Sequence, residues 1–452
     1  MRVLTTLLSK EEVGNYYLLL TVITLLNFVF FHPIRQYYSR HLIQWKRSHN
    51  LSNATVTLLL LRLIGGILSL LASFVIYKIL GYGNYSSLFT FLTFIFLSLV
   101  AENYEIFVAA VNTLGDRIRF TVFMVLTLTF GLVLSILIVS FVSRSAMGWL
   151  YGLIVSQIVS SFLLYKYVVK DSTLSLDRIK SSIQKGYVTE VSLFIIPVTL
   201  TLFLQWGQSQ FYRFIVETKY SLQVLATIGI GLSISGAVFS AVEGLATQFY
   251  NPIYLRKITH ASKEERARQW NELADYMLPI YVILMVFVII LSPYLTSLFV
   301  ASKFYHAYVY TMFGAMIEFF RVVTNLVYKV SLSEVKSFKT VFPYSLGFLF
   351  TLCSLFFCDF SERLWMIPLM VVVGNLIIFI TLFYSMKKLL DIKINYFSIL
   401  KTIFLVSPLC FVLLFTNTQQ LLQCLFMLGF SGVYLLLLLY LIVEKKVLRV
   451  RL

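Results

Sequence analysis

The fold is decided by residues 187–257, where two apolar runs flank a short polar turn. The first run, Val188–Leu204, reads VTEVSLFIIPVTLTLFL and is followed by QWGQSQFYR at 205–213. The second run, Leu222–Phe249, reads LQVLATIGIGLSISGAVFSAVEGLATQF and is followed by NPIYLRK at 251–257. Each run is long enough to cross a bilayer as a helix. The stretch therefore predicts a membrane hairpin with basic residues beyond its far ends.

The composition extends this interpretation to the whole chain. Apolar residues make up 59% of the 452 residues and charged residues only 13%, against about 25% charged in an ordinary soluble domain. The mean hydropathy is +0.86. These values predict an all-α polytopic membrane protein. The net charge of +17 is assigned to topology signals at helix ends rather than to a nucleic-acid partner.

No cofactor or metal is predicted. The four cysteines lie in or beside apolar runs without metal-ligand spacing, and the five histidines are scattered. Small apolar core positions are the expected places for such cysteines. No catalytic residue is assigned, and the chain is not expected to be an enzyme.

Thirteen apolar runs are predicted to cross the membrane. Their approximate bounds are 13–33, 54–80, 85–112, 119–142, 146–166, 187–211, 220–250, 273–301, 306–328, 340–358, 364–386, 399–416 and 420–443. Lysine and arginine concentrate in every second connector, including those at 166–186 and 251–272. The positive-inside rule then makes this set of connectors cytoplasmic. The C-terminus is therefore predicted to be cytoplasmic, and the first run crosses from outside to inside.

An internal repeat is indicated by two similar helix ends. The run at 13–33 is followed by HPIRQYY and the run at 220–250 by NPIYLR, with the same predicted orientation. Proline as a helix stop is the plain alternative for both. A repeat predicts an N-terminal lobe at 1–170, a C-terminal lobe at 187–388 and an extra helical hairpin at 399–443. In that scheme the hairpin helix at 187–211 has no visible counterpart, so the N-terminal lobe is expected to lack its first helix.

Two short motifs carry a resemblance to a known family. LSKEEVGNY at 8–16 resembles the leucine–serine–x–glutamate–x–x–glycine–x–tyrosine signature of bacterial polysaccharide flippases. The turn Arg213–Val216 and the helix end at Pro252 are similar to the second half of that family. These flippases form the O-antigen (Wzx-like) and capsule branch of the multidrug/oligosaccharidyl-lipid/polysaccharide superfamily. The position before Arg213 is commonly acidic in the family, whereas this chain has Tyr212.

The resemblance implies a fold and a function. It implies two lobes of helices that alternate access to a central cavity, with fourteen helices in the longer form. It implies an undecaprenyl-diphosphate-linked oligosaccharide as the cargo, flipped from the cytoplasmic to the outer face of the bacterial plasma (inner) membrane for O-antigen, capsule or exopolysaccharide (lipopolysaccharide) synthesis. A polymerase and a chain-length regulator of the same pathway are the implied protein partners.

Arg62 and Glu102 are the first candidate site residues, because a charge inside a bilayer is costly and needs a reason. Arg62 lies about 12 Å and Glu102 about 15 Å from the predicted inner helix ends, at 1.5 Å per residue. Two interpretations stay open. The residues form a structural ion pair, or Arg62 binds a diphosphate with two parallel hydrogen bonds while Glu102 serves as counter-ion or coupling site. Glu105, one turn nearer the inside, is expected to be more solvated.

Four further candidates come from the second half. Glu318 and Arg321 are three residues apart on one helix face, as a self-neutralising pair or as cavity lining with Arg321 binding substrate. Glu243 has no local partner in the sequence and is a second candidate for ion coupling. Arg213 is either an interfacial residue or a substrate-binding one.

The sequence thus favours a flippase with Arg62, Arg321 and Arg213 as substrate-binding candidates and Glu102, Glu243 and Glu318 as ion-coupling candidates. Two alternatives remain. A MATE-like drug or cation exporter is expected to have an acidic or aromatic cavity. A polysaccharide polymerase, which is a membrane glycosyltransferase, is expected to have a sizeable outer loop, whereas the predicted outer connectors are short.

Overall fold

The computed structural model is helical throughout the part of the chain that it describes, which comprises residues 1–79, 81, 86–168, 185–258, 261–334, 336–414 and 421–451. Each of the thirteen predicted spans coincides with a helical segment there. Nine of the described segments are long and apolar enough to cross a membrane. The predicted polytopic all-α class is therefore confirmed. Most of the basic connector predicted at 166–186 lies outside the described residues.

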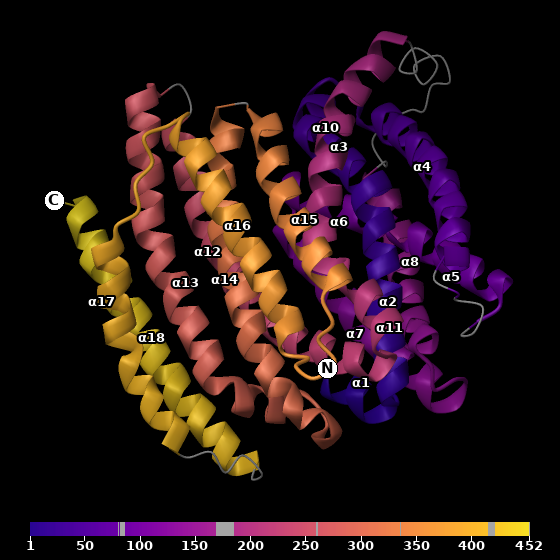
Figure 1. Ribbon diagram of the computed structural model, residues 1–452. Coiled ribbons are helices and arrows are strands. Elements are labelled where there is room, and N and C mark those ends of the chain that lie inside the picture. The colour runs from indigo at the N-terminus through magenta and orange to yellow at the C-terminus, as the bar shows by residue number, and fades with distance from the viewer. Residues whose placement is uncertain are drawn as a thin grey trace. The chain divides into compact units, whose positions relative to one another are not determined.

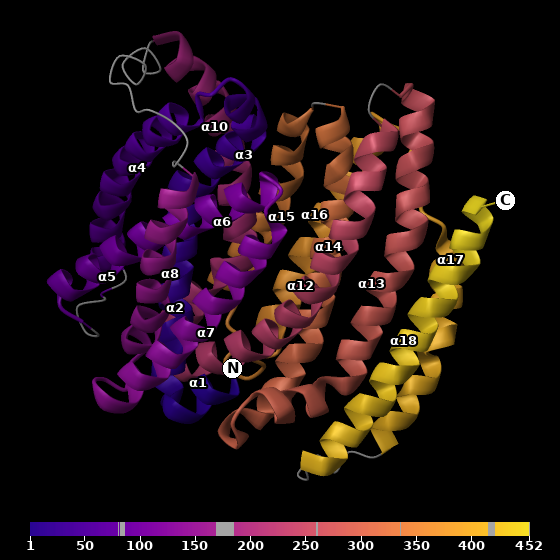
Figure 2. The ribbon, with the colours of Figure 1, turned by 180° about the vertical axis from the view of Figure 1, so that it is seen from behind.

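The chain divides into two compact units. The first, here called the N-terminal unit, covers Leu7–Lys219. Its elements are α2 (Lys10–Leu26), a π-helical turn η1 (Asn27–Phe31), α3 (His32–Arg47), α4 (Leu51–Ile79), α5 (Leu88–Ala101), α6 (Asn103–Thr113), α7 (Arg117–Phe141), α8 (Ala146–Val168), α10 (Lys185–Gln210) and α11 (Tyr212–Lys219). Figure 2 shows α7 beside α8, the two helices of this unit that pack most extensively.

The second, here called the C-terminal unit, covers Tyr220–Leu452 together with Met1–Thr6. Its elements are α1 (Arg2–Leu7), α12 (Leu222–Ile258), α13 (Lys263–Phe299), η3 (Ser302–Ala307), α14 (Tyr308–Ser333), η4 (Ser337–Thr340), α15 (Val341–Phe357), α16 (Met366–Lys387), α17 (Tyr396–Val406), η5 (Ser407–Leu414) and α18 (Leu421–Arg451). The hairpin of α17 and α18 lies along α13 (Figure 1).

The two units repeat one packing scheme. In the N-terminal unit the first long helical segment, α2–α3, packs on α4 and α6, the α5–α6 segment packs on α8, and α7 packs on α8. In the C-terminal unit α12 packs on α13 and α14, α14 on α16, and α15 on α16. The same order of helices with the same neighbours supports the predicted pseudo-repeat.

Two predicted helix ends are wrong. The helical segment that contains Pro33 continues to Arg47, and α12 continues past Pro252 to Ile258. Pro33 occupies the first turn of α3, directly after the π-helical turn. A proline inside a regular α-helix clashes with the carbonyl four residues earlier, and the wider π-helical turn directly before Pro33 is the place where this helix departs from that regular geometry. Proline therefore marks an irregularity in this span and not its end.

The compact units do not coincide with the predicted lobes. Helix α10 was expected to open the C-terminal lobe, but it packs against α2, η1 and α3, and it belongs with α11 to the N-terminal unit. Trp206 of α10 donates its indole N–H to the Thr21 carbonyl oxygen at 3.2 Å and is buried. The lobes at 1–170 and 187–388, which were defined as sequence repeats, stay a prediction.

The LSKEE motif has a structural role. Ser9 caps α2 by accepting a hydrogen bond from the Glu12 N–H at 3.2 Å. The same SKEE letters recur at 262–265, where Ser262 caps α13 through the Glu265 N–H. Serine followed three residues later by glutamate is a capping-box sequence. Glu12 also accepts a hydrogen bond from the Ala146 N–H at 2.6 Å, which holds the start of α2 to the start of α8.

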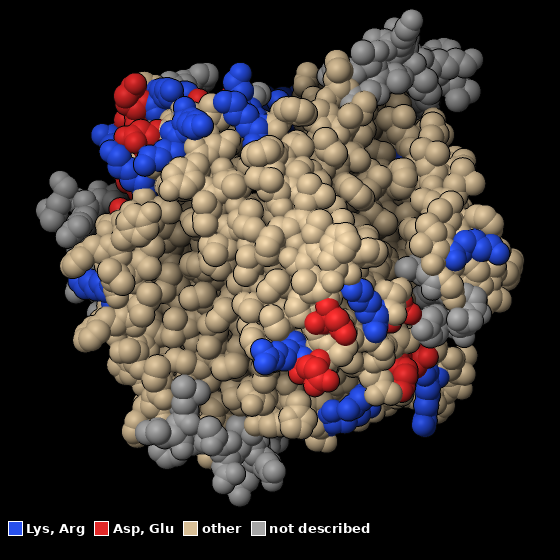
Figure 3. All heavy atoms as spheres, in the orientation of Figure 1, with Lys and Arg blue, Asp and Glu red and all other residues tan. Residues whose placement is uncertain are grey.

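Charges are segregated along the helices. Figure 3 shows Lys, Arg, Asp and Glu side chains gathered over the start of α13, and a broad face without them along the body of the helices below. In the N-terminal unit α4 and α7 expose rows of large apolar side chains, among them Leu63, Leu71, Leu126 and Leu128. Such rows are expected where helices face lipid.

Candidate functional site

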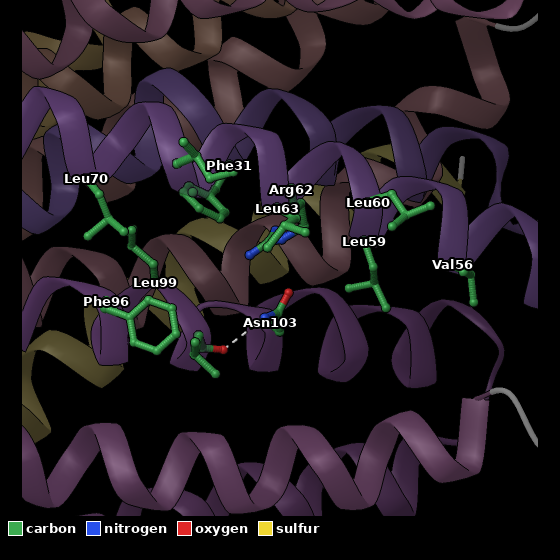
Figure 4. Close-up of a pocket in the computed structure, with 13 residues that line it drawn as sticks. Phe31, Val56, Leu59, Leu60, Arg62, Leu63, Leu70, Phe96, Leu99 and Asn103 are labelled. Carbon is green, nitrogen blue, oxygen red and sulfur yellow. Dashed lines mark hydrogen bonds between the residues drawn. The ribbon is translucent and has the colours of Figure 1, made fainter. Parts of the chain in front are cut away.

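The predicted residue Arg62 lines a cavity of about 370 Å³ inside the N-terminal unit. The cavity lies between α4 and the α5–α6 segment, with Phe31 of η1 contributing one side (Figure 4). Its lining is apolar apart from Arg62 and Asn103. The complete lining is Phe31, Val56, Leu59, Leu60, Arg62, Leu63, Gly66, Ile67, Leu70, Phe96, Leu99, Val100 and Asn103.

The Arg62 side chain is buried without an ion-pair partner among the described residues. Only 4% of the residue is exposed, and its Nε and Nη2 atoms have no hydrogen-bond partner. Its guanidinium carbon lies 4.6 Å from the centre of the Phe31 ring. A cation–π contact contributes about 0.5–2 kcal/mol, whereas burying an unpaired charge costs several kcal/mol. Arg62 is therefore a buried cation without a salt bridge among the described residues, although the Glu102 carboxylate acts on it electrostatically.

Two irregular helix segments meet Arg62 at the same level. The first span has a π-helical turn at Asn27–Phe31, and its last residue is the one that covers the guanidinium. The third span is interrupted at Glu102, between α5 and α6. Single π turns and broken membrane helices occur frequently at functional sites. Neither irregularity is visible in the apolar pattern of the sequence.

Glu102 does not form the predicted ion pair with Arg62 in the described structure. Its carboxylate interacts electrostatically with Arg62, and it accepts a hydrogen bond from the Asn27 side chain. Glu105 pairs instead with Arg35 of α3, at 2.9 Å, and its side chain is 45% exposed. The expected solvation of Glu105 is confirmed. Because Glu105 pairs with Arg35, the charged residues of this site that have no salt bridge within the described structure are Arg62 and Glu102.

The other predicted charges of the membrane interior come together in the C-terminal unit. Arg321 of α14 donates to Glu318 at 2.6 Å and to Glu243 of α12 at 2.8 Å. Asn325, one turn further along α14, donates to Glu243 at 3.2 Å. Tyr281 of α13 lies within the electrostatic reach of Glu243 and Arg321. Two carboxylates share one guanidinium here, and Lys329 of α14 also lies within the electrostatic reach of Glu243.

The sequence missed part of this group. The Glu318–Arg321 pair was expected. Glu243 has no local partner in the sequence, and its contact with Arg321 arises because α12 packs against α14. Asn325 lies four residues after Arg321, on the same helix face, and that spacing was a readable signal. Tyr281 could be placed here only by the tertiary structure.

Arg213 stands apart from the Arg62 cavity. It begins α11 and lies over the ring of Tyr17 at 5.1 Å, with long hydrogen bonds to the Tyr17 carbonyl and the Thr21 hydroxyl at 3.5 and 3.4 Å. The neighbouring Tyr212 hydroxyl accepts from Arg213 Nε at 3.3 Å. These contacts join α11 to α2. None of the three partner residues lines the cavity.

The arrangement therefore offers two chemically different sites in one chain. The N-terminal unit holds a cation in an apolar cavity, with a nearby carboxyl group that lacks a salt bridge. The C-terminal unit holds two carboxylates, Glu243 and Glu318, on one guanidinium, here called the anionic cluster after its carboxylates. The site in the N-terminal unit suits an amphipathic anion, because its walls are apolar and the Arg62 guanidinium offers several hydrogen-bond donors.

Comparisons with known proteins place the fold. No family model and no curated protein matches the chain. Among solved structures, it matches an inward-facing multidrug resistance MATE family transporter of the MOP superfamily with a TM-score of 0.64 and 14% identity, over 90% of this chain and 93% of that one. It matches the lipid II flippase MurJ in an inward closed conformation with a TM-score of 0.64 and 13% identity, over 97% and 98%. The chain therefore shares its fold with these two solved structures.

Proposed function

We propose that this protein translocates a lipid-diphosphate-linked oligosaccharide repeat unit from the cytoplasmic to the outer face of a bacterial plasma membrane. The single observation that carries the proposal is Arg62, a buried guanidinium that lines an apolar cavity and has no salt bridge within the described part of the chain. An oligosaccharide bound to a polyprenyl diphosphate supplies both the anion and the hydrocarbon that this cavity suits. The pathway is that of O-antigen, capsule or exopolysaccharide synthesis, with a polymerase and a chain-length regulator as downstream partners.

The proposed mechanism makes and breaks no covalent bond. Arg62 donates two parallel hydrogen bonds to the diphosphate, and the change of access carries the head group across while the lipid chain stays in hydrocarbon. Protonation of Glu102 removes the nearby negative charge that competes for Arg62. Binding of the diphosphate and protonation of Glu102 are thereby coupled.

The remaining predicted residues take subordinate roles in this proposal. Arg321 is held between Glu318 and Glu243, and Arg213 is engaged with α2. Arg321 or Arg213 can bind a phosphate only after it has released its present hydrogen-bond partners. Glu243 and Glu318 provide a second coupling site, where one of the two carboxylates binds a proton or a sodium ion.

The test is complementation of a strain that lacks its own repeat-unit flippase and has matched sugar synthesis. Wild type, Arg62→Ala and Arg62→Lys are compared for surface polysaccharide at equal expression. We expect rescue by wild type, loss with Arg62→Ala, and partial rescue with Arg62→Lys, which keeps the charge but not the bidentate fork. Arg268→Ala, a change at an exposed side chain, is the matched control and should rescue fully. Rescue by Arg62→Ala equal to wild type contradicts the proposal.

The anionic cluster favours a second candidate, an exporter of organic cations. Two carboxylates around one arginine would attract a cationic solute. The same strains distinguish the two functions, because an exporter lowers the accumulation of a cationic dye. Dye efflux that is lost in Glu243→Gln and kept in Arg62→Ala would support the exporter in place of the flippase.

A further inference from the structure

We propose that the Arg62 cavity is a lateral binding site for the junction between the phosphate and the hydrocarbon chain of a polyprenyl diphosphate lipid. This inference rests on the proposed function and adds where the lipid is held, namely between α4 and the α5–α6 segment. The diphosphate is bound by Arg62, and the first part of the chain lies along the apolar wall of α4 and leaves towards the bilayer.

The cavity opens on the apolar surface of the N-terminal unit. Four of its lining residues are also exposed, namely Leu60, Leu63, Ile67 and Phe96, with between 42% and 62% of each residue accessible. They border the cavity on the same side as the exposed rows of α4. A hydrocarbon chain bound in the cavity can therefore extend into the lipid bilayer without crossing a polar surface. A water-soluble ligand would not need such an opening.

The polar atoms inside the cavity match a phosphate ester. Arg62 Nε and Nη2 are donors without partners, and Asn103 Oδ1 is a buried acceptor without a partner. One N–H of the Asn103 amide donates to the Val100 carbonyl at 3.0 Å (Figure 4). Two free donors suit the anionic oxygens of a diphosphate, and one free acceptor suits a phosphate or sugar hydroxyl.

The depth of Arg62 distinguishes this ligand from an ordinary phospholipid. Arg62 lies eleven residues after the start of α4 at Leu51 and seventeen before its end at Ile79. At 1.5 Å per residue these separations are about 16 Å and 26 Å. The phosphate of a resident phospholipid stays at the membrane interface, so a phosphate site at this depth serves a lipid that is crossing the bilayer.

The decisive experiment places a photo-crosslinking amino acid at Leu63 of the full-length protein in nanodiscs. The matched control position is Leu126 on α7, which is equally exposed but borders no cavity described here. The probe is undecaprenyl diphosphate, with phosphatidylglycerol and inorganic pyrophosphate as competitors. We expect labelling at Leu63 at least tenfold above that at Leu126, a tenfold loss with Arg62→Gln, and competition by neither competitor.

Three results would overturn the site. They are equal labelling at both positions, labelling that is unchanged in Arg62→Gln, and full competition by phosphatidylglycerol, which would indicate a general phospholipid groove. Displacement by inorganic pyrophosphate alone would show that the anion is bound without its chain, which also contradicts the proposal.

A cavity-filling variant separates this inference from the proposed function. Gly66 lines the cavity, and a Cβ built there meets no atom within 4 Å. Gly66→Leu should fill the cavity and abolish both labelling and rescue, whereas Gly432→Leu, at an equally open glycine of α18, should abolish neither. If Gly66→Leu abolishes labelling but still restores surface polysaccharide, the site takes no part in transport and the flippase proposal is unaffected. If the wild-type protein is strongly labelled but does not restore surface polysaccharide, the flippase proposal is contradicted and the binding site is supported.

Discussion

Arg62 shows how one residue can be costly to the fold and still be required. Its charge is buried beside Phe31 with two unpaired donors, and no ion pair offsets the loss of hydration in the described structure. A residue that only stabilised the protein would not be selected in this environment, since an apolar side chain of similar length fits it better. The proposed binding of a diphosphate would give a physical reason for a cation at this position.

The first prediction follows from that cost. Arg62→Met should leave the free energy of unfolding unchanged or raise it by up to about 4 kcal/mol, while surface polysaccharide is lost. Thermal unfolding of the purified protein in detergent measures the stability. Arg266→Met should instead lower the free energy of unfolding by about 1–3 kcal/mol, because Arg266 is joined to Glu334 by two hydrogen bonds of 2.8 and 3.1 Å. A large loss of stability in Arg62→Met would refute the assignment.

The anionic cluster gives the second prediction. Glu318→Gln removes one of the two carboxylates that contact Arg321, so that Glu243 is the remaining carboxylate on this guanidinium. Translocation of a fluorescent lipid-diphosphate analogue into proteoliposomes should then stop responding to an imposed proton or sodium gradient. Glu272→Gln, on an exposed carboxylate, should keep the wild-type response. If Glu318→Gln still responds to either gradient as wild type does, the cluster is not the coupling site.

At the scale of single elements, local chemistry sets where helices begin. Ser9 and Ser262 each cap a helix by accepting a backbone N–H hydrogen bond, and the glutamate three residues later completes the capping-box spacing. The motif that resembles a flippase signature is therefore also a helix start. Its presence indicates the fold before it indicates any substrate.

The third prediction tests that role. Ser9→Ala should destabilise the N-terminal unit by about 0.5–2 kcal/mol and reduce the amount of folded protein, without changing which polysaccharide is exported per folded molecule. Ser262→Ala should act similarly through α13, and Ser9→Asp should restore the cap. Folded protein is measured by size-exclusion chromatography with a fluorescent fusion. A change of cargo at normal protein level would show that the motif contacts substrate.

Close helix contacts decide the packing of α7 on α8. A Cβ at Gly152 would lie 2.2 Å from the backbone nitrogen of Ser135, so only glycine permits this approach. Beside it, the Ser135 hydroxyl donates to the Trp149 carbonyl at 2.6 Å. Small residues with interhelical hydrogen bonds are typical of membrane helix interfaces.

The fourth prediction uses this contact. Gly152→Val should cost about 1–3 kcal/mol or more, because the helices must separate to admit the side chain. Gly432→Val, at a glycine with open space around it, should change the unfolding temperature little. The comparison of both melting curves in the same detergent provides the test. Equal melting temperatures for the two variants would show that α7 and α8 pack less closely than in the structure.

For the whole molecule, the alternation of basic connectors predicts the topology. It places the C-terminus in the cytoplasm and the end of α15 on the outer face. Cys358 directly follows α15 and is exposed, whereas Cys353 lies within the helix.

The fifth prediction is therefore a labelling pattern. A membrane-impermeant maleimide added outside intact cells should label wild type and lose its signal in Cys358→Ser, while Cys353→Ser leaves the signal unchanged. Apolar surroundings slow the reaction of Cys353, since the thiolate is the reactive form. Labelling of Cys358 only after the cells are opened would invert the topology.

The order of helices was predictable because it depends on local properties. Apolar length relative to bilayer thickness reveals each span, and the thirteen predicted spans coincide with helices in the described parts of the chain. The continuation of helices past Pro33 and Pro252 was not predictable from a rule that treats proline as a stop. Whether proline ends a membrane helix depends on how neighbouring helices accommodate the irregularity.

The sequence by itself determined that this is a helical membrane protein, how many spans it has, and which charged residues stand inside them. Only the tertiary structure decided which of those charges are paired. Among the residues that the structure describes, Arg321 forms salt bridges with two carboxylates and Arg62 forms none, although both are arginines in apolar helices. The physical reason is that the cost of a buried charge is a property of the residue, whereas its compensation depends on the rotation of the helix and on the side chains that neighbouring helices bring within hydrogen-bonding distance.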